Sequence, residues 1–331
     1  MKGSYNFKVK SKRVVFEFSI RRNITVIKGD SATGKTTLLH MLYEYLRAGR
    51  ESGYTVFTNA DYFVYLRREV GREWKDALTV LKNTVIFIEE NNQFVFSEEF
   101  AEFVKTSGNY FVLVSRSPLK MLPYSIHEVY EIVSDRKHAD IKEAYHQFKE
   151  LYSNYPFVKN NKMDIVVTED RCSGYQFFST LFYKRNVVSA EGNGGIINAV
   201  QQACTGDVLA VVDGAAFGAM VEQCIEYFEA QESRRIALWM PESFEYLILV
   251  SGIIHSEELE EILGAVSDHV DSSEYESWER YFTQLLVSLT EHTPYKYSKK
   301  DLNEYYTKRI NLIKIIEKFP EAIKKNCDFK Q

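Results

Sequence analysis

The sequence predicts an α/β protein with a parallel-sheet domain, a second α/β domain and a helical C-terminal tail. Short runs of consecutive apolar residues, such as 84–88 and 110–114, are typical of strands buried on both faces of a parallel sheet. These runs alternate with segments of helical spacing, as expected when helices cover such a sheet. The alternation stops in a polar stretch around Pro156 and restarts at Asp164. A length of 331 residues suits two domains of about 150 residues each.

The first domain is expected at residues 1–155. Its expected strands lie at 5–9 and 14–18, which form a hairpin, and at 24–27, 56–57, 84–88, 110–114 and 128–132. Helices are expected at 36–46, at 73–81, and from the favourable N-cap Ser97 to Val104. The polar stretch 140–152 is expected to be helical. Together these elements indicate a parallel sheet covered on both faces.

The second domain is expected at residues 156–265. Its expected strands are 165–168, 187–189, 208–212 and 236–239, and its expected helices are 175–183, 196–203, 216–228 and 244–253. The pattern is helical from Ser256 onward, and residues 266–331 form the expected tail. Within the tail, residues 296–330 carry ten Lys or Arg and five Asp or Glu, a balance of +5. We favour a helix that packs an apolar stripe on the body, and the alternative is a nucleic-acid contact through the interleaved tyrosines.

Composition narrows the function classes. The net charge of −5 gives the whole chain no attraction to phosphate backbones, so any nucleic-acid surface must be a local basic patch. The four cysteines form no C-x-x-C pair, which favours reduced thiols over a zinc site. No run of about 18 apolar residues is present, and the first residues lack the apolar core of a signal peptide. We therefore expect a cytoplasmic protein that does not span a membrane.

A phosphate-binding motif follows the expected strand 24–27. Residues 29–36 match G-x-x-x-x-G-K-[ST] at each fixed position and precede an expected helix. The glycines let successive backbone N–H groups point inward and form an anion site, which the helix N-terminus strengthens. Lys35 is expected to reach the β and γ phosphates, and Thr36 to offer its hydroxyl to Mg²⁺. The residues expected to bind the nucleotide are Gly29, Asp30, Ser31, Ala32, Thr33, Gly34, Lys35, Thr36 and Thr37.

An apolar run at residues 85–88 ends in two acids, Glu89 and Glu90. This run resembles a Walker B strand, with Glu89 in place of the commoner Asp. The resemblance is to the P-loop NTPase superfamily and covers residues 13–135. It implies that Glu89 is a ligand of Mg²⁺ and that Glu90 activates water, with Lys35 as the other catalytic residue. The alternative interpretation is a buried strand that ends in solvated acids.

Ser115 and Arg116 follow the next apolar strand. In related ATPases a polar residue at this place senses the γ phosphate, although Arg116 could also be a surface charge. We expect ATP rather than GTP, because no N-K-x-D motif is present to recognise guanine. No L-S-G-G stretch of the ABC type is found.

Three places in the second half carry acids where strands end or a helix begins. Glu169 ends the strand 165–168, Asp213 ends the strand 208–212, and Glu245 follows the strand 236–239 at the start of a helix. This pattern over residues 164–250 resembles the Toprim fold, which topoisomerases, primases and the overcoming-lysogenization-defect nucleases share. The resemblance implies that Glu169, Asp213 and Glu245 hold Mg²⁺. It also implies that Glu169 and Asp213 act on phosphodiester bonds of DNA or RNA.

Two positions depart from the Toprim pattern. The second Asp of the D-x-D motif is Ala215, and Asp170 stands where Gly is usual. A site that lacks one carboxylate binds metal less well, although Asp170 or Glu242 could substitute. The glycine loop at 192–195 could cradle a phosphate at a helix start or could simply form a turn.

Two functions from different classes follow from these motifs. The first is an ATPase whose nucleotide state controls a Toprim-like nuclease module, as in the bacterial and mobile-element defence proteins that the chain resembles. The second is an ATP-dependent switch or scaffold with a non-cleaving second domain, which Ala215 favours. In that case ATP would set the assembly of a homo-oligomer or the binding of a partner protein. A metabolic kinase is less favoured, because no Arg-rich lid is found.

Overall fold

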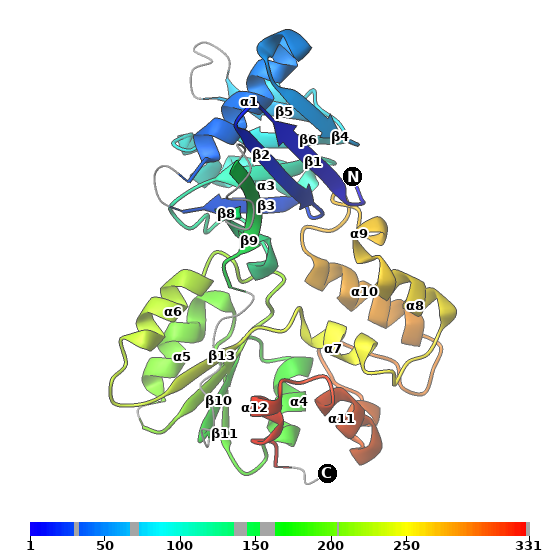
Figure 1. Ribbon diagram of the computed structural model, residues 1–331. Helices are drawn as coiled ribbons and strands as arrows, with labels where there is room; N and C mark the ends of the chain where they lie inside the picture. Colours follow the sequence, from blue (N-terminus) through cyan, green and yellow to red (C-terminus); the bar gives the residue numbers. More distant parts are fainter. Residues whose placement is uncertain (30–32, 67–72, 136–143, 153–162, 204, 329–331) are drawn as a thin grey trace. The chain divides into compact units, whose positions relative to one another are not determined.

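The computed structural model describes residues 1–29, 33–66, 73–135, 144–152, 163–203 and 205–328 (Figure 1). The chain divides into two compact units. Unit 1 consists of residues 1–154 and 265–277, and unit 2 of residues 155–264 and 278–331. The expected tail 266–331 is therefore not a separate region, because its first part belongs to unit 1 and its remainder to unit 2. Within the described ranges, no helix has both the length and the apolar character needed to span a membrane.

Unit 1 is built on a mixed sheet that has nine strands among its described residues, in the order β4-β1-β2-β9-β8-β3-β7-β6-β5. The strands are β1 (Tyr5–Lys10), β2 (Val14–Ile20), β3 (Ile24–Lys28), β4 (Thr55–Thr58), β5 (Asp61–Tyr65), β6 (Thr84–Ile88), β7 (Tyr110–Val114), β8 (Val129–Asp135) and β9 (Ala144–Glu150). The α-helices described in this unit are α1 (Lys35–Ala48), α2 (Trp74–Leu78), α3 (Glu98–Thr106) and α9 (Val266–His269).

The centre of the unit 1 sheet is parallel, as predicted. Strands β3, β6 and β7 are buried at every residue, and β7 pairs in parallel with both of the others. The pairs β1–β2, β1–β4 and β8–β9 are antiparallel, so the prediction of a parallel sheet holds only for part of it. For β1 and β2 the physical reason is the short turn between them, since a parallel neighbour would require a longer crossover.

Strand β9 overturns one sequence prediction, because residues 140–152 were expected to be helical. In the structure β9 fills the gap between β2 and β8 and pairs with both. Two of its aromatic rings stack on rings of β2: His146 on Phe16 at 4.9 Å between centroids, and Phe148 on Phe18 at 4.2 Å. Local helical spacing is a weak preference, and strand pairing with distant residues outweighs it here. Strand β5 was not predicted.

Helices α1 and α3 begin where the sequence predicts. The Ser97 hydroxyl accepts a hydrogen bond from the Phe100 N–H at 3.2 Å, which confirms Ser97 as the N-cap of α3. Helix α1 buries Leu38 and Leu42 in a core that includes Phe87 of β6. This packing holds the N-terminus of α1 against the end of β3.

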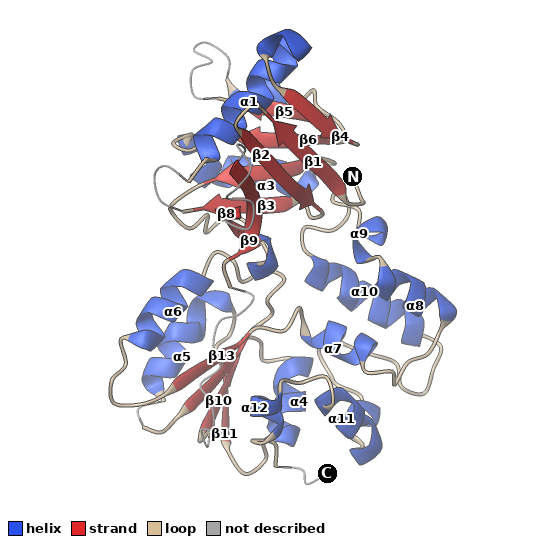
Figure 2. Cartoon of the chain, in the orientation of Figure 1, coloured by secondary structure: helices blue, strands red, loops and turns tan. Residues whose placement is uncertain are grey.

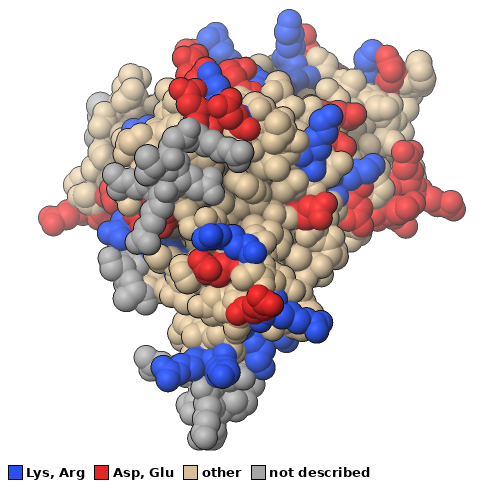
Figure 3. Space-filling view, turned by 90° about the horizontal axis from the view of Figure 1, so that it is seen from above, with Lys and Arg blue, Asp and Glu red and all other residues tan. Residues whose placement is uncertain are grey.

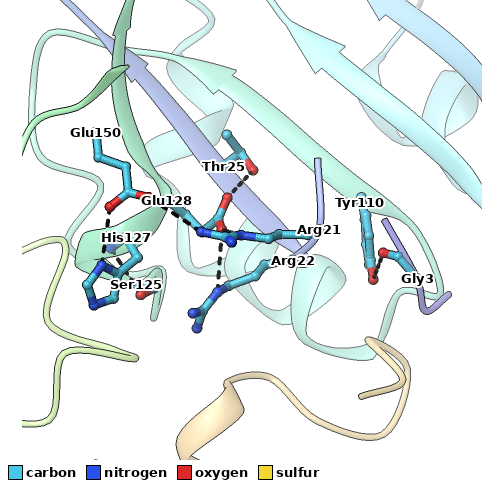
Figure 4. A network of polar contacts seen from close by, with 9 residues as sticks. All are labelled: Gly3, Arg21, Arg22, Thr25, Tyr110, Ser125, His127, Glu128 and Glu150. Atoms are coloured by element: carbon cyan, nitrogen blue, oxygen red, sulfur yellow. Dashed lines mark hydrogen bonds and ion pairs between the residues drawn. The ribbon is translucent and has the colours of Figure 1, made fainter. Parts of the chain in front are cut away.

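A buried ion-pair network lies where β3 and β8 begin, at the sheet edge opposite the end of β3 (Figure 4). Glu128 is fully buried and accepts hydrogen bonds from Arg21 Nε and Thr25 Oγ1, both at 3.0 Å. Arg22 Nε lies 3.4 Å from the same carboxylate. Burial raises the pKa of Glu128, and the two guanidinium groups oppose that rise. The network ties the residues before β3 to the residue before β8.

Unit 2 contains a parallel sheet, as predicted, and its strand order is β11-β10-β12-β13. Its strands are β10 (Ile165–Thr168), β11 (Asn186–Ser189), β12 (Val208–Val211) and β13 (Ile236–Trp239). Its described α-helices are α4 (Ser173–Leu181), α5 (Ile196–Gln202), α6 (Val221–Glu229), α7 (Phe244–Val250), α8 (Glu257–Gly264), α10 (Trp278–Thr290), α11 (Arg309–Ile316) and α12 (Glu321–Lys324). Figure 2 shows α5 and α6 on one face of this sheet and α4 and α12 on the other.

The C-terminal part of unit 2 packs on its body rather than forming one long helix. Phe319 is buried and its ring lies 4.5 Å from that of Trp239 at the end of β13. Two of the tyrosines considered for base stacking, Tyr297 and Tyr306, are buried. Ile310, an apolar residue of the same segment, is 70% exposed, so not every apolar residue of the segment faces the body. The structure therefore favours the packing interpretation of this segment over a base-stacking one.

Candidate functional site

The glycine-bounded loop connects the end of β3 to the start of α1. Gly29 has φ of +116° and Gly34 has φ of +100°, a left-handed region in which only glycine is free of strain. Gly34 directly precedes Lys35, the first residue of α1. Of the expected nucleotide-binding residues, Asp30, Ser31 and Ala32 lie outside the described residues. The predicted strand, turn and helix are present in the predicted order.

The Lys35 ammonium is buried within this loop. Its Nζ donates hydrogen bonds to the Gly29 carbonyl oxygen at 2.5 Å and to Thr33 Oγ1 at 3.1 Å. These two acceptors are neutral, and charged phosphate oxygens are stronger acceptors for an ammonium. Thr36 and Thr37 are exposed, and their hydroxyls are accessible to a ligand.

A cavity of about 510 Å³ lies beside the loop. Residues 33–37 form one wall, Glu90 and Arg116 a second, and the β2 and β9 side chains Phe16 and His146 a third. Its volume falls in the range of roughly 300–1,000 Å³ that small-molecule sites occupy. The cavity therefore joins the loop to residues that follow β6 and β7 and to residues that lie within β2 and β9.

Of the two acids that follow β6, it is Glu90 that lines the cavity. Its carboxylate pairs with Arg116 Nε at 2.7 Å. Glu89 is half-buried, and its backbone N–H donates to the Tyr65 carbonyl oxygen at 3.0 Å. Because β7 lies between β3 and β6, the residues after β6 and β7 reach the loop from the same side of β3. Ser115 is buried, and its hydroxyl donates to the Ser117 carbonyl oxygen at 2.7 Å.

In unit 2, two of the predicted acids come together at the carboxyl ends of adjacent strands. Glu169 follows β10 and Asp213 lies two residues after β12, and these strands pair in parallel. The Asp213 N–H donates to Glu169 Oε2 at 2.8 Å. With its amide nitrogen turned towards Glu169, Asn193 donates to both carboxylate oxygens, at 2.7 and 2.8 Å. The glycine loop at 192–195 thus places a hydrogen-bond donor against Glu169.

Glu245, the third predicted acid, lies in the first turn of α7. It is 1% exposed, and its Oε1 accepts a hydrogen bond from the Tyr297 hydroxyl at 2.8 Å. Its other oxygen, Oε2, is buried without a hydrogen-bond partner in the described part of the chain. The N–H of Phe244, the preceding residue, donates to Asp213 Oδ1 at 3.1 Å. The start of α7 is therefore attached to the Glu169–Asp213 pair.

Sequence reasoning missed two charged residues of this acidic cluster, Glu279 of α10 and Lys299. Lys299 Nζ lies 2.6 Å from Glu279 Oε1 and 3.7 Å from Glu245 Oε1. Lys299 had been counted only as one of the basic residues of the tail, and no local motif marks Glu279. Both are brought to the cluster by the packing of α10 and of the segment that follows it.

The concentration of carboxylates changes their acidity. Burial raises the pKa of Glu169 to about 8, and Glu279 and Asp170 add to this rise. Burial, Glu279 and Glu169 together raise the pKa of Asp213 well above its ordinary value. Burial lowers the pKa of Lys299, but Glu245 and Glu279 outweigh it and raise the pKa overall. The cluster thus holds more carboxylates than its lysine neutralises, a situation that a bound cation would relieve.

The structure does not complete the expected set of metal ligands. Ala215 is buried, and its N–H donates to the Glu242 carbonyl oxygen at 3.0 Å. Asp170 Oδ1 accepts a hydrogen bond from the Tyr175 N–H at 3.1 Å, near the start of α4. No three Asp, Glu, His or Cys side chains among the described residues are arranged to hold one metal ion. A metal bound by Glu169, Asp213 and Glu245 would therefore require side chains to move.

No protein-family model matches the sequence, and no curated protein or solved structure is significantly similar to it. The function is therefore argued from the two sites themselves.

Proposed function

We propose that unit 1 binds and hydrolyses a nucleoside triphosphate, ATP, as its magnesium complex. The main support is the Lys35 ammonium, which lies inside a loop bounded by two left-handed glycines at the N-terminus of α1. Backbone N–H groups and the positive end of a helix bind phosphate in such loops. The adjoining cavity brings Glu90 and Arg116 to the same place.

Each residue has a role in this proposal. Lys35 binds the β and γ phosphates, the Thr36 hydroxyl holds Mg²⁺, and Glu90 accepts a proton from the attacking water. Glu89 does not line the cavity in this structure, so its role as the second Mg²⁺ ligand requires its side chain to turn towards the loop. The metal ion supplies neutralisation of the phosphate charge. Arg116, which pairs with Glu90, adds a positive charge at the γ-phosphate end. Glu90 is free to act as a base only when Arg116 shifts towards the phosphate.

The test is titration calorimetry with ATP and Mg²⁺, followed by a phosphate-release assay. Lys35→Ala is expected to abolish binding, and Glu90→Gln to retain binding but lose hydrolysis. Lys12→Ala serves as the matched control, because Lys12 is an exposed lysine in the same unit. Undiminished binding by Lys35→Ala would show that the loop does not hold the phosphates.

For unit 2, we infer a metal-dependent site for phosphodiester chemistry on DNA or RNA, controlled by the nucleotide state of unit 1. It rests on the Glu169–Asp213 pair at the ends of adjacent parallel strands, the position where such sites form. The buried Glu245 Oε2, which has no hydrogen-bond partner among the described residues, and the surplus of carboxylates suit a cation. Glu169, Asp213 and Glu245 would hold Mg²⁺, which would polarise the scissile phosphate.

Charge on the surface bears on where nucleic acid could bind. On the face drawn in Figure 3, Lys and Arg side chains are mixed with Asp and Glu, so the described residues there form no basic patch. Plasmid nicking with Mg²⁺ or Mn²⁺ tests the proposal directly. Asp213→Ala is expected to abolish nicking, and Glu258→Ala, which removes an exposed acid of α8, is expected to leave it intact. Equal nicking by wild type and Asp213→Ala would remove the nuclease function.

A second candidate is an ATP-dependent switch or scaffold whose unit 2 does not cleave. It is favoured by the missing carboxylate at Ala215 and by Lys299, which already neutralises part of the cluster. In this case nicking assays are negative, and ATP changes the assembly of the chain with itself or with a partner protein. Light scattering with and without ATP distinguishes the candidates, because only the switch requires a change in mass.

A further inference from the structure

Two stacked aromatic rings line one wall of the unit 1 cavity, and the proposed function assigns no role to either of them. Phe16 of β2 and His146 of β9 are partners in the parallel register of the two strands. Their ring centroids are 4.9 Å apart and the ring planes differ by 20°. Phe16 is 1% exposed and His146 is half-buried, so Phe16 supports the imidazole from beneath.

The strand order sets the position of this pair relative to the loop. Strands β2 and β9 lie on one side of β3, and β7 and β6 lie on the other. Glu90 and Arg116 therefore approach the loop from the opposite side to Phe16 and His146. If the γ phosphate lies beside Glu90, the nucleoside end of the ligand leaves the loop on the side of the aromatic pair.

Phe16 also touches the loop directly. A Cβ atom built on Gly34 would lie 3.3 Å from Cε1 and Cζ of the Phe16 ring. The ring pair thus lies directly beside Gly34, the residue that precedes Lys35. Thr36 and Thr37, the exposed residues of the first turn of α1, line the same cavity between the loop and His146.

A hydrogen bond holds the imidazole ring in place. Ser134 of β8 is the antiparallel partner of His146, and Ser134 Oγ lies 3.2 Å from His146 Nδ1. Burial lowers the pKa of His146, which favours the neutral imidazole. A neutral ring that is fixed in orientation and backed by a buried phenyl ring is a suitable surface for stacking.

We propose that the Phe16–His146 pair is the platform on which the nucleobase of the bound triphosphate stacks. This inference rests on the proposed function of unit 1 and adds a recognition surface for the base. Stacking of a base on an aromatic side chain changes affinity by about tenfold or more. The pair is therefore expected to make a nucleoside triphosphate bind more tightly than the triphosphate group alone.

The test compares Mg²⁺–ATP with inorganic tripolyphosphate, which has the phosphates but no base. His146→Ala is expected to weaken ATP binding about tenfold and to leave tripolyphosphate binding unchanged. His146→Phe retains an aromatic ring and is expected to bind ATP nearly as well as wild type. Gln147→Ala, at the exposed neighbouring position of β9, is the matched control and is expected to bind both ligands normally.

Several outcomes would overturn the platform. One is ATP binding by His146→Ala at wild-type affinity, and another is an equal loss of ATP and tripolyphosphate in that variant. A third is equal affinity of the wild-type protein for ATP and for tripolyphosphate. That result would be compatible with phosphate binding by the loop but would show that the base does not contribute to affinity. Absence of binding of either ligand to wild type would instead overturn the proposed function together with the platform.

Discussion

The buried ion-pair network of Glu128 offers the sharpest test of the unit 1 fold, because it does not depend on any ligand. The perturbation is Glu128→Gln, which preserves shape and removes the charge. In the folded protein Arg22 is only 6% exposed, so its guanidinium group would remain buried opposite a neutral amide. Arg21 is 41% exposed and can turn towards water, so Arg22 accounts for most of the cost.

The magnitude follows from that burial. Removal of one partner of a buried ion pair costs about 3–5 kcal/mol, because the remaining charge is uncompensated. We expect a loss of at least about 3 kcal/mol in the free energy of unfolding of unit 1. Glu131→Gln, on β8 three residues after Glu128, is the control, since Glu131 pairs with the exposed Lys149 at 3.0 Å. A pair of that kind contributes about 0–1 kcal/mol.

The assay is urea unfolding combined with hydrogen exchange at the amides of β3 and β8, which reports on this part of unit 1. Arg22→Met in the Glu128→Gln background removes the buried guanidinium charge and is expected to recover part of the loss. A Glu128→Gln protein within about 1 kcal/mol of wild type would refute the reasoning. It would mean that Arg22 reaches water or another acceptor when Glu128 is neutral.

Three further predictions concern other parts of the chain. Gly34→Ala is expected to cost about 1–2 kcal/mol in backbone strain, and the added methyl group, 3.3 Å from the Phe16 ring, also requires that ring to shift. Gly53→Ala, at φ +78° with nothing within 4 Å, has the strain alone, and urea unfolding compares the two variants. Lys299→Met is expected to lower the thermal unfolding midpoint measured in EDTA, because it removes the charge that neutralises part of the acidic cluster. Mg²⁺ is expected to raise the midpoint of this variant more than that of wild type. An equal effect of Mg²⁺ on variant and wild type would contradict a cation site. The hydrogen bond with His127 lowers the pKa of Glu150, although burial opposes this shift. The ionised Glu150 therefore stabilises the folded protein above the ordinary pKa of 4.5, and this stabilisation is lost as pH falls through the lower pKa of the folded state. Glu150→Gln should therefore flatten the acid limb of stability against pH, and an unchanged limb would count against this pair.

Residue patterns that depend on near neighbours were predicted correctly. The apolar runs of β3, β6 and β7 and the Ser97 cap of α3 follow from the chemistry of a few consecutive residues. The glycine-bounded turn between β3 and α1 is of the same kind, because left-handed backbone angles are a local requirement for glycine. Whether that turn binds a nucleotide remains a prediction.

Features that depend on distant residues were missed or wrong. The helical expectation at residues 140–152 failed because β9 is stabilised by pairing with β2 and β8, which local spacing does not report. Glu279 and Lys299 were not recognised as neighbours of Asp213, since they lie far along the chain and carry no motif.

The sequence by itself therefore determined most of the strands, the glycine-bounded turn between β3 and α1, and the acids at the strand ends. Only the tertiary structure decided the order of strands in the unit 1 sheet, the stacking of Phe16 with His146, and the charges that surround Glu169 and Asp213. The physical reason is that backbone conformation responds to residues a few positions away, whereas strand neighbours and ion pairs are selected by the packing of the whole unit.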